Sequence, residues 1–187
     1  ACLETLVKNH LGVYLDFELP PSPTAQEFIW QLDCRLHRLG KQCIVPEAYI
    51  PATAHALASI PARLTGGSLK QRLLEASAHY DNGICVELIR GAIELPLPCL
   101  HNQQTLYSTE EALEKMRAGH YPLHYSSDFC CEYFFMLEKD RAKVVLIDTP
   151  NTLWEKYNLA SQCGATLCIG LLTELGEDFL FQNKRSR

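Results

Sequence analysis

Short apolar strands alternate with amphipathic helices along most of this 187-residue chain. Residues 12–18, 43–46 and 84–89 have the apolar composition of buried strands, and residues with helical spacing lie between them. Strands that alternate with helices form a parallel sheet, because each connection crosses the sheet through a helix in a right-handed turn. The sequence therefore predicts an α/β fold.

Helix starts are marked in three places by a hydroxyl side chain with Glu or Gln three residues later, the pattern of a capping box. The pairs are Thr24 with Glu27, Ser68 with Gln71, and Ser108 with Glu111. The first of these helices has one apolar stripe, and we expect it to end at Gly40. The other two are expected to end near His79 and at Gly119.

The rest of the chain continues the alternation of strands and helices. The expected elements are an opening helix over 3–11, a short strand over 92–95, a hairpin between 132–137 and 143–147, a helix from Pro150 to Gly164, and a last strand over 166–172. The segments 51–67 and 98–105 have no clear pattern. Five or six strands fit either an open doubly wound sheet or a barrel, and the chain is shorter than the roughly 250 residues of a complete eight-stranded barrel.

Composition narrows the classes of partner. A formal net charge of −5 argues against nucleic acid, which is bound by basic surfaces. No apolar run reaches the length of about 18 residues that a membrane span needs, and no signal peptide is visible, so we expect no membrane partner. The nine cysteines include no Cys-x-x-Cys pair, which favours free thiols and a cytoplasmic location.

Two carboxylates stand at the end of the strand over 12–18. Side chains alternate along a strand, so Tyr14, Asp16 and Glu18 face one side, opposite three apolar residues. Carboxylates two residues apart lie roughly 7 Å from each other. Active sites of α/β folds are built at the carboxyl ends of the strands, so Asp16 and Glu18 are the first candidates for a catalytic pair.

Polar residues at the ends of two further strands are candidates for binding substrate. Glu47 and Tyr49 follow the strand over 43–46, and Glu87 and Arg90 lie at the end of the strand over 84–89. A charge within an apolar strand is costly unless it is paired or functional. Each of these charged residues therefore also fits a structural ion pair, and Glu87 and Arg90 are expected to have separate partners.

The run from Gly12 to Glu18 resembles the fourth-strand signature of family 18 glycoside hydrolases, Asp-x-x-Asp-x-Asp-x-Glu. Its last Asp and its Glu fall on Asp16 and Glu18, and its first two Asp positions fall on Leu11 and Tyr14. The segment 146–170 is similar to the last helix and eighth strand of the family, and the opening helix is similar to its third helix. The resemblance extends to the branch found with spore-cortex and peptidoglycan-acting proteins.

This resemblance implies a single partial β/α-barrel domain over 1–187, from helix three to strand eight. The chain is then a fragment of a longer protein, or another chain completes the barrel. The resemblance also implies a substrate of β-linked N-acetylglucosamine glycan, either chitin or peptidoglycan. Glu18 would act as general acid and then base, Asp16 would orient the acetamido group that serves as nucleophile, and Tyr14 would line the site. No metal or organic cofactor is implied.

Two other functions remain open. Family members usually carry a Trp on strand eight, whereas residues 169–173 contain none, which favours a non-catalytic glycan-binding or scaffold domain. Apolar strand edges left uncovered by a partial barrel would instead favour self-association. A zinc site is not expected from His120, His124, Cys130 and Cys131, because their spacing fits no standard zinc motif.

Overall fold

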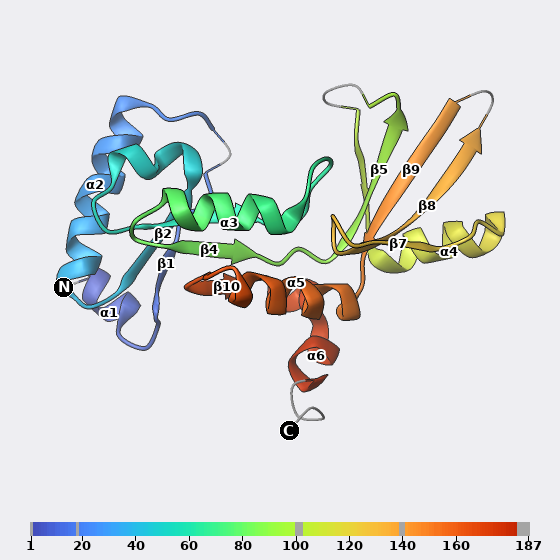
Figure 1. Cartoon of the computed structure of the whole chain (residues 1–187). Helices are drawn as coiled ribbons and strands as arrows, with labels where there is room; N and C mark the ends of the chain where they lie inside the picture. Colours follow the sequence, from blue (N-terminus) through green and yellow to red (C-terminus); the bar gives the residue numbers. More distant parts are fainter. Residues whose placement is uncertain (1, 18, 100–102, 139–140, 183–187) are drawn as a thin grey trace.

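The computed structural model describes residues 2–17, 19–99, 103–138 and 141–182 (Figure 1). A five-stranded parallel sheet has the order β1-β2-β3-β4-β10. Its strands are β1 (Gly12–Tyr14), β2 (Gln42–Pro46), β3 (Leu57–Pro61), β4 (Ile84–Glu87) and β10 (Leu167–Ile169). The predicted α/β fold is confirmed, with the parallel strands forming part of a β/α barrel.

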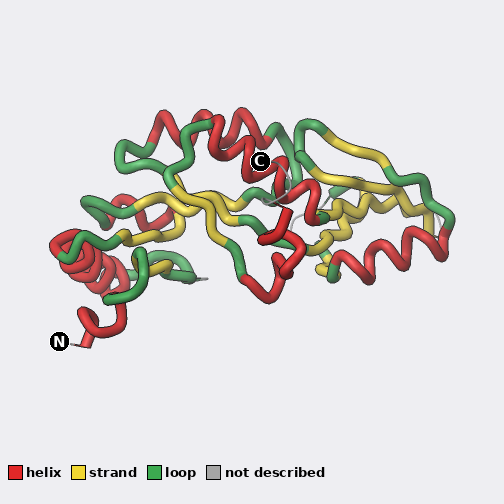
Figure 2. Tube along the Cα trace, turned by 90° about the horizontal axis from the view of Figure 1, so that it is seen from below, coloured by secondary structure: helices red, strands yellow, loops and turns green. Residues whose placement is uncertain are grey.

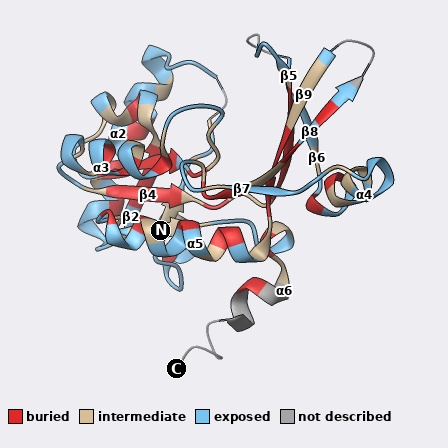
Figure 3. Ribbon diagram, turned by 45° about the vertical axis from the view of Figure 1, so that its right-hand side comes forward, coloured by how far each residue is buried: buried red, intermediate tan, exposed pale blue. Residues whose placement is uncertain are grey.

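Helices cover one face of the parallel sheet. They are α1 (Cys2–Val7), α2 (Pro23–Arg38), α3 (Leu69–His79) and α5 (Pro150–Gln162), with a 3-10 helix, η1 (Glu47–Ala52), after β2. The last helix, α6 (Leu172–Gln182), packs against α5. Ile29 and Leu36 of α2 pack on Val45, and Leu73 of α3 and Leu153 of α5 belong to a second cluster around β3 and β4. Figure 3 shows the buried residues gathered in the strands and on the helix faces next to them.

A second, antiparallel sheet is inserted between β4 and α5, with the order β6-β5-β9-β8-β7. Its strands are β5 (Gly91–Leu97), β6 (Thr105–Tyr107), β7 (His124–Ser126), β8 (Cys131–Glu138) and β9 (Arg141–Asp148). Helix α4 (Thr109–Gly119) packs on one face, where Ala112 meets Phe134 and Val145. Figure 2 shows the two sheets side by side, with α4 along the antiparallel one.

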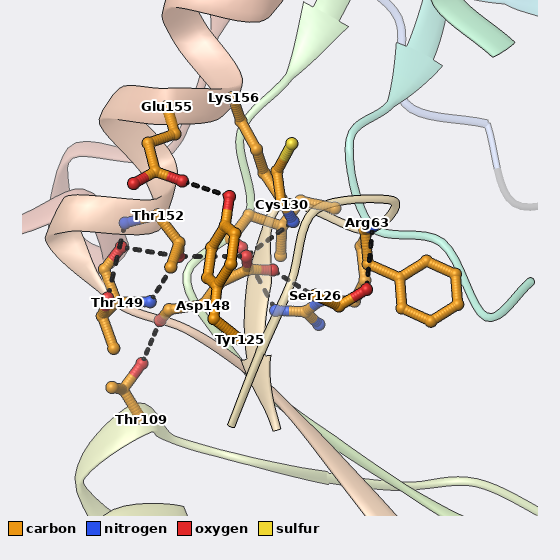
Figure 4. A network of polar contacts seen from close by, with 12 residues as sticks. Arg63, Thr109, Tyr125, Ser126, Cys130, Asp148, Thr149, Thr152, Glu155 and Lys156 are labelled. Carbon is orange, nitrogen blue, oxygen red and sulfur yellow. Dashed lines mark hydrogen bonds and ion pairs between the residues drawn. The ribbon is translucent and has the colours of Figure 1, made fainter. Parts of the chain in front are cut away.

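A buried polar network joins the two sheets (Figure 4). Asp148, the last residue of β9, forms an ion pair with Lys156 of α5 at 2.5 Å, and both side chains are at most 4% exposed. Arg63, just after β3, lies 3.7 Å from the other oxygen of Asp148. The hydroxyl of Thr109, at the start of α4, donates to the carbonyl of Asp148. The junction therefore ties β3, β9, α4 and α5 together.

Several predicted boundaries need correction. The capping box of Thr24 with Glu27 is wrong, because Ser22 is the N-cap and accepts from the Ala25 amide, with Pro23 in the first turn. Ser68 is an N-cap, but its side chain makes no capping bond. The box of Ser108 with Glu111 is confirmed.

Three strands are shorter than expected, and others were missed. β1 ends at Tyr14, β4 at Glu87 and β10 at Ile169, and Leu172 already begins α6. The predicted alternation of side chains continues past the end of β1, because Val13, Leu15 and Phe17 all pack against the hydrophobic cluster of α2. The strands β3, β6 and β7 fall where the sequence pattern gave no strand. The hairpin of β8 with β9 is confirmed.

Candidate functional site

A cleft of about 500 Å³ lies at the carboxyl ends of β1, β4 and β10. It is lined by Tyr14, Asp16, Glu87, Leu88, Ile89, Ile169, Gly170, Leu171 and Glu174. Parallel strands bring their carboxyl ends to one edge of the sheet, so residues far apart in the sequence meet here. Three of the predicted site residues, Tyr14, Asp16 and Glu87, are brought together in this cleft.

Glu87 is held by two hydroxyl groups on the face of the sheet away from the helices. The Tyr14 hydroxyl donates to Glu87 Oε1 at 2.8 Å, and the Ser59 hydroxyl donates to the same oxygen. Burial and the hydrogen bond to Glu87 raise the pKa of Tyr14, so its phenol stays protonated as a donor. The side chains of β1, β3 and β4 therefore form one connected polar group at the cleft.

Asp16 lies two residues beyond Tyr14 and is exposed in the same cleft. It contributes a small part of the rise in the pKa of Tyr14, behind burial and Glu87. Glu18 lies outside the described residues. The geometry of the Asp16 and Glu18 pair therefore stays a prediction.

Glu47 and Tyr49 lie in η1 and do not line this cleft. Glu47 pairs with Arg72 and accepts from the Tyr80 hydroxyl at 2.9 Å. Tyr49 is 2% exposed, and its hydroxyl donates to the carbonyl of Leu19 at 2.8 Å. Both side chains have structural contacts that occupy their polar atoms, so we do not place them in the proposed site.

Arg90 lies in a second hollow next to the cleft. Its Nη2 is 2.7 Å from Glu110 Oε1, and its Nη1 donates to the carbonyl of Leu175 at 3.3 Å. Glu87 and Arg90 thus have separate partners, as expected. Ile89 and Glu174 line both the cleft and the second hollow, so the two spaces adjoin.

The sequence did not indicate Glu174 and Gly170 of the cleft, or Ser59, which bonds to Glu87. Ser59 was missed because β3 was not predicted, and Glu174 because no helix was predicted after the last strand. Gly170 is required by close packing, since a Cβ there would lie 2.8 Å from both the Leu88 carbonyl and the Leu175 side chain. A glycine directly after an apolar strand is the signal that could have indicated Gly170.

The described residues include no group of three His, Cys, Asp or Glu side chains placed to hold a metal ion. His120 caps the end of α4 in a left-handed conformation, whereas Cys131 is buried on β8. The eight cysteines whose side chains the structure describes are free. In the same part of the chain, no helix is both long and apolar enough to cross a bilayer.

Solved structures of chitinases and of a spore cortex-lytic enzyme share this fold. The spore cortex-lytic enzyme SleL of Bacillus megaterium matches 99% of this chain with a TM-score of 0.66 and 14% identity, and 52% of its own length is covered. A chitinase of Chromobacterium violaceum matches 98%, with a TM-score of 0.66, 15% identity and 68% of its own length covered.

A mutant class V chitinase of Nicotiana tobaccum, solved in complex with NAG4, an N-acetylglucosamine oligomer, matches 94% of the chain. Its TM-score is 0.59, its identity is 10%, and 67% of its own length is covered. No family model matches the sequence, and no curated protein matches it significantly.

These likenesses confirm the partial barrel resembling the chitinases and spore cortex-lytic enzymes, at the level of the fold. The chain spans about half the length of SleL. Five parallel strands of the eight in a complete barrel are present in the described residues.

Proposed function

We propose that this chain is a glycoside-hydrolase-like domain that acts on β-linked N-acetylglucosamine glycans. One observation carries the proposal: the cleft at the carboxyl edge of the parallel sheet collects Asp16, Tyr14 and Glu87, on a fold shared with chitinases and spore cortex-lytic enzymes. Binding of an N-acetylglucosamine oligomer by the tobacco enzyme supports the same class of ligand.

The proposed reaction is hydrolysis with retention, assisted by the substrate. Glu18 donates a proton to the leaving glycosidic oxygen, while the oxygen of the 2-acetamido group attacks the anomeric carbon. Asp16 stabilises the acetamido group as positive charge develops on it. Water then attacks the anomeric carbon and displaces the acetamido oxygen, while the Glu18 carboxylate takes a proton from the water, which restores the acid.

Tyr14 and Glu87 provide the polar wall of the cleft in this proposal. The raised pKa of Tyr14 keeps its hydroxyl protonated and donating to Glu87, which fixes the position of the phenol oxygen as an acceptor. The hydroxyl and amide N–H groups of a sugar ring require acceptors such as this oxygen and the Glu87 carboxylate. The pair therefore supports positioning of the sugar rather than proton transfer.

A non-catalytic glycan-binding domain is the second candidate, and the aromatic residues favour it. No Trp lines the cleft among the described residues. Trp154 lies on α5 and stacks on Phe179 at 4.6 Å, and Trp30 is half exposed on α2. Ile169 and Gly170 line the β10 end of the cleft, where the resembled family usually carries a Trp.

Release of a chromogenic leaving group from chitobiose and chitotriose substrates by the full-length protein tests the two candidates. Hydrolysis predicts turnover that Glu18→Gln lowers by about 10²–10⁴-fold and Asp16→Asn by about 10²-fold. Glu114→Gln, at an exposed site on α4, and Asp81→Asn, in an exposed turn, are the matched controls. Glycan binding without turnover in any form would support the second candidate, and absence of both would contradict the proposal.

A further inference from the structure

A second hollow of about 480 Å³ adjoins the cleft across the wall formed by Ile89 and Glu174. We name it the arginine hollow, after the two guanidinium groups that line it. Its polar lining consists of Arg63, Arg90, Ser108, Thr109, Glu110 and Glu174, together with Tyr107 and Thr173. It lies where the parallel sheet meets the antiparallel sheet, at the start of α4.

Arg63 brings a positive charge that its own surroundings do not cancel. Its Nη2 donates to the carbonyl of Ile89 at 3.2 Å, and its Nε is 3.7 Å from Asp148. Asp148 is shared with Lys156, which lies closer, at 2.5 Å, so two cations surround one carboxylate (Figure 4). The three groups together carry one positive charge next to the hollow.

Arg90 is the second cation, and its carboxylate partner can be exchanged. The Arg90 side chain is 18% exposed, whereas that of Glu110 is 65% exposed. Ion pairs with an exposed partner contribute little, because water and salt compete with them. A carboxylate supplied by a ligand can therefore take the place of Glu110 on Arg90.

The start of α4 adds to this preference for an anion. Ser108 is the N-cap, and the Glu111 carboxylate already accepts from its N–H and hydroxyl. Thr109 and Glu110 form the first turn, where backbone N–H groups and the helix dipole favour negative charge. Glu174 opposes an anion at the wall shared with the cleft. We therefore place the anion between Arg63, Arg90 and the start of α4, away from Glu174.

We propose that the arginine hollow binds a carboxylate substituent of the glycan whose sugar occupies the cleft, with Glu110 competing for Arg90. This inference rests on the proposed function of the cleft. The ligand class is then an aminosugar glycan that carries carboxylates, of which N-acetylmuramic acid with its lactyl ether is one, rather than a neutral glycan such as chitin.

Calorimetry with a matched pair of ligands tests the inference in the full-length protein. The first ligand is the disaccharide of N-acetylglucosamine with N-acetylmuramic acid, and the second is the same disaccharide with its carboxylate converted to the amide. We expect the acid to bind about tenfold more tightly than the amide at low salt. Arg90→Gln should abolish this preference, while Arg117→Gln, at an exposed site on α4, should keep it.

A variant that binds more tightly tests the inference independently of folding, because a misfolded variant would bind more weakly. Glu110→Gln should tighten binding of the acid several-fold and leave the amide unchanged, because it removes the competing carboxylate. Glu114→Gln, one turn further along α4, should change neither. Equal binding of acid and amide by the unaltered protein would overturn the proposal that the arginine hollow binds a carboxylate, and it would still support the cleft as a glycan site. Binding of neither ligand would overturn both proposals.

Discussion

At the scale of single residues, the best-defined feature of the cleft is Glu87 with its two hydroxyl donors, Tyr14 and Ser59. The sequence indicated Tyr14 and Glu87, because each polar side chain stands at the end of an apolar strand. It could not indicate that they bond to each other, since 73 residues separate them. The partner of Glu47 could not be predicted either. Arg72 lies on helix α3, and the pattern of the strand before Glu47 does not indicate which helix residue Glu47 will meet.

Tyr14→Phe removes one donor from Glu87 and leaves Ser59 in place. We expect the free energy of unfolding to fall by about 1 kcal/mol, because one hydrogen bond to a charged acceptor is lost from a partly exposed site. Urea unfolding measures this loss. Tyr157→Phe is a matched control, since Tyr157 is 38% exposed and Tyr14 37%, and the described structure gives no hydrogen bond to its hydroxyl. Equal effects of the two changes would show that the bond to Glu87 contributes nothing.

At the scale of elements, apolar runs that are buried on both faces were predictable, and strands of small residues were not. The apolar run Ile-Cys-Val makes β4 recognisable, whereas β3 contains Ala58 and Ser59 and ends in Pro61. Sequence pattern alone also cannot separate a strand from the helix that follows it when both are apolar, as at β10 and α6. Of the antiparallel sheet, the sequence predicts only a hairpin and one short strand. The strands β6 and β7 have three residues each, too few to form a recognisable pattern.

Glu94 on β5 links the antiparallel sheet to α4 through charge. Its carboxylate is 3.0 Å from Lys115 on α4 and 2.8 Å from Lys143 on β9. Burial alone would raise the pKa of Glu94, but the two lysines outweigh burial and lower it below its ordinary value of 4.5. A lowered pKa in the folded state means that this carboxylate stabilises the fold above about pH 4.5 and ceases to do so as the pH falls further.

Glu94→Gln therefore should lower the free energy of unfolding by about 1–3 kcal/mol at pH 7. It should also reduce the fall in stability between pH 5 and about pH 3, because the group that titrates there is gone. Urea unfolding over this pH range measures both effects. Glu114→Gln, on the exposed side of α4, should keep the pH dependence of the unaltered protein, and a Glu94→Gln profile parallel to it would contradict this account.

At the scale of the whole molecule, the parallel sheet has two open edges. Within the described residues β1 pairs only with β2, and β10 only with β4, whereas a complete barrel has no edges. The cleft lies across these two edge strands, so whatever covers them would also shape the site. Self-association through the edges, expected from the sequence, stays a prediction, as does completion of the barrel by a further segment or chain.

The most direct test of a glycan site in the cleft is a crystal structure of the full-length protein with a bound N-acetylglucosamine oligomer. We predict the sugar in the cleft beside Tyr14 and Asp16, with the Glu18 carboxyl about 2.6–3.2 Å from the glycosidic oxygen. An oligomer bound elsewhere, or a Glu18 side chain directed into bulk solvent away from the sugar, would contradict the account.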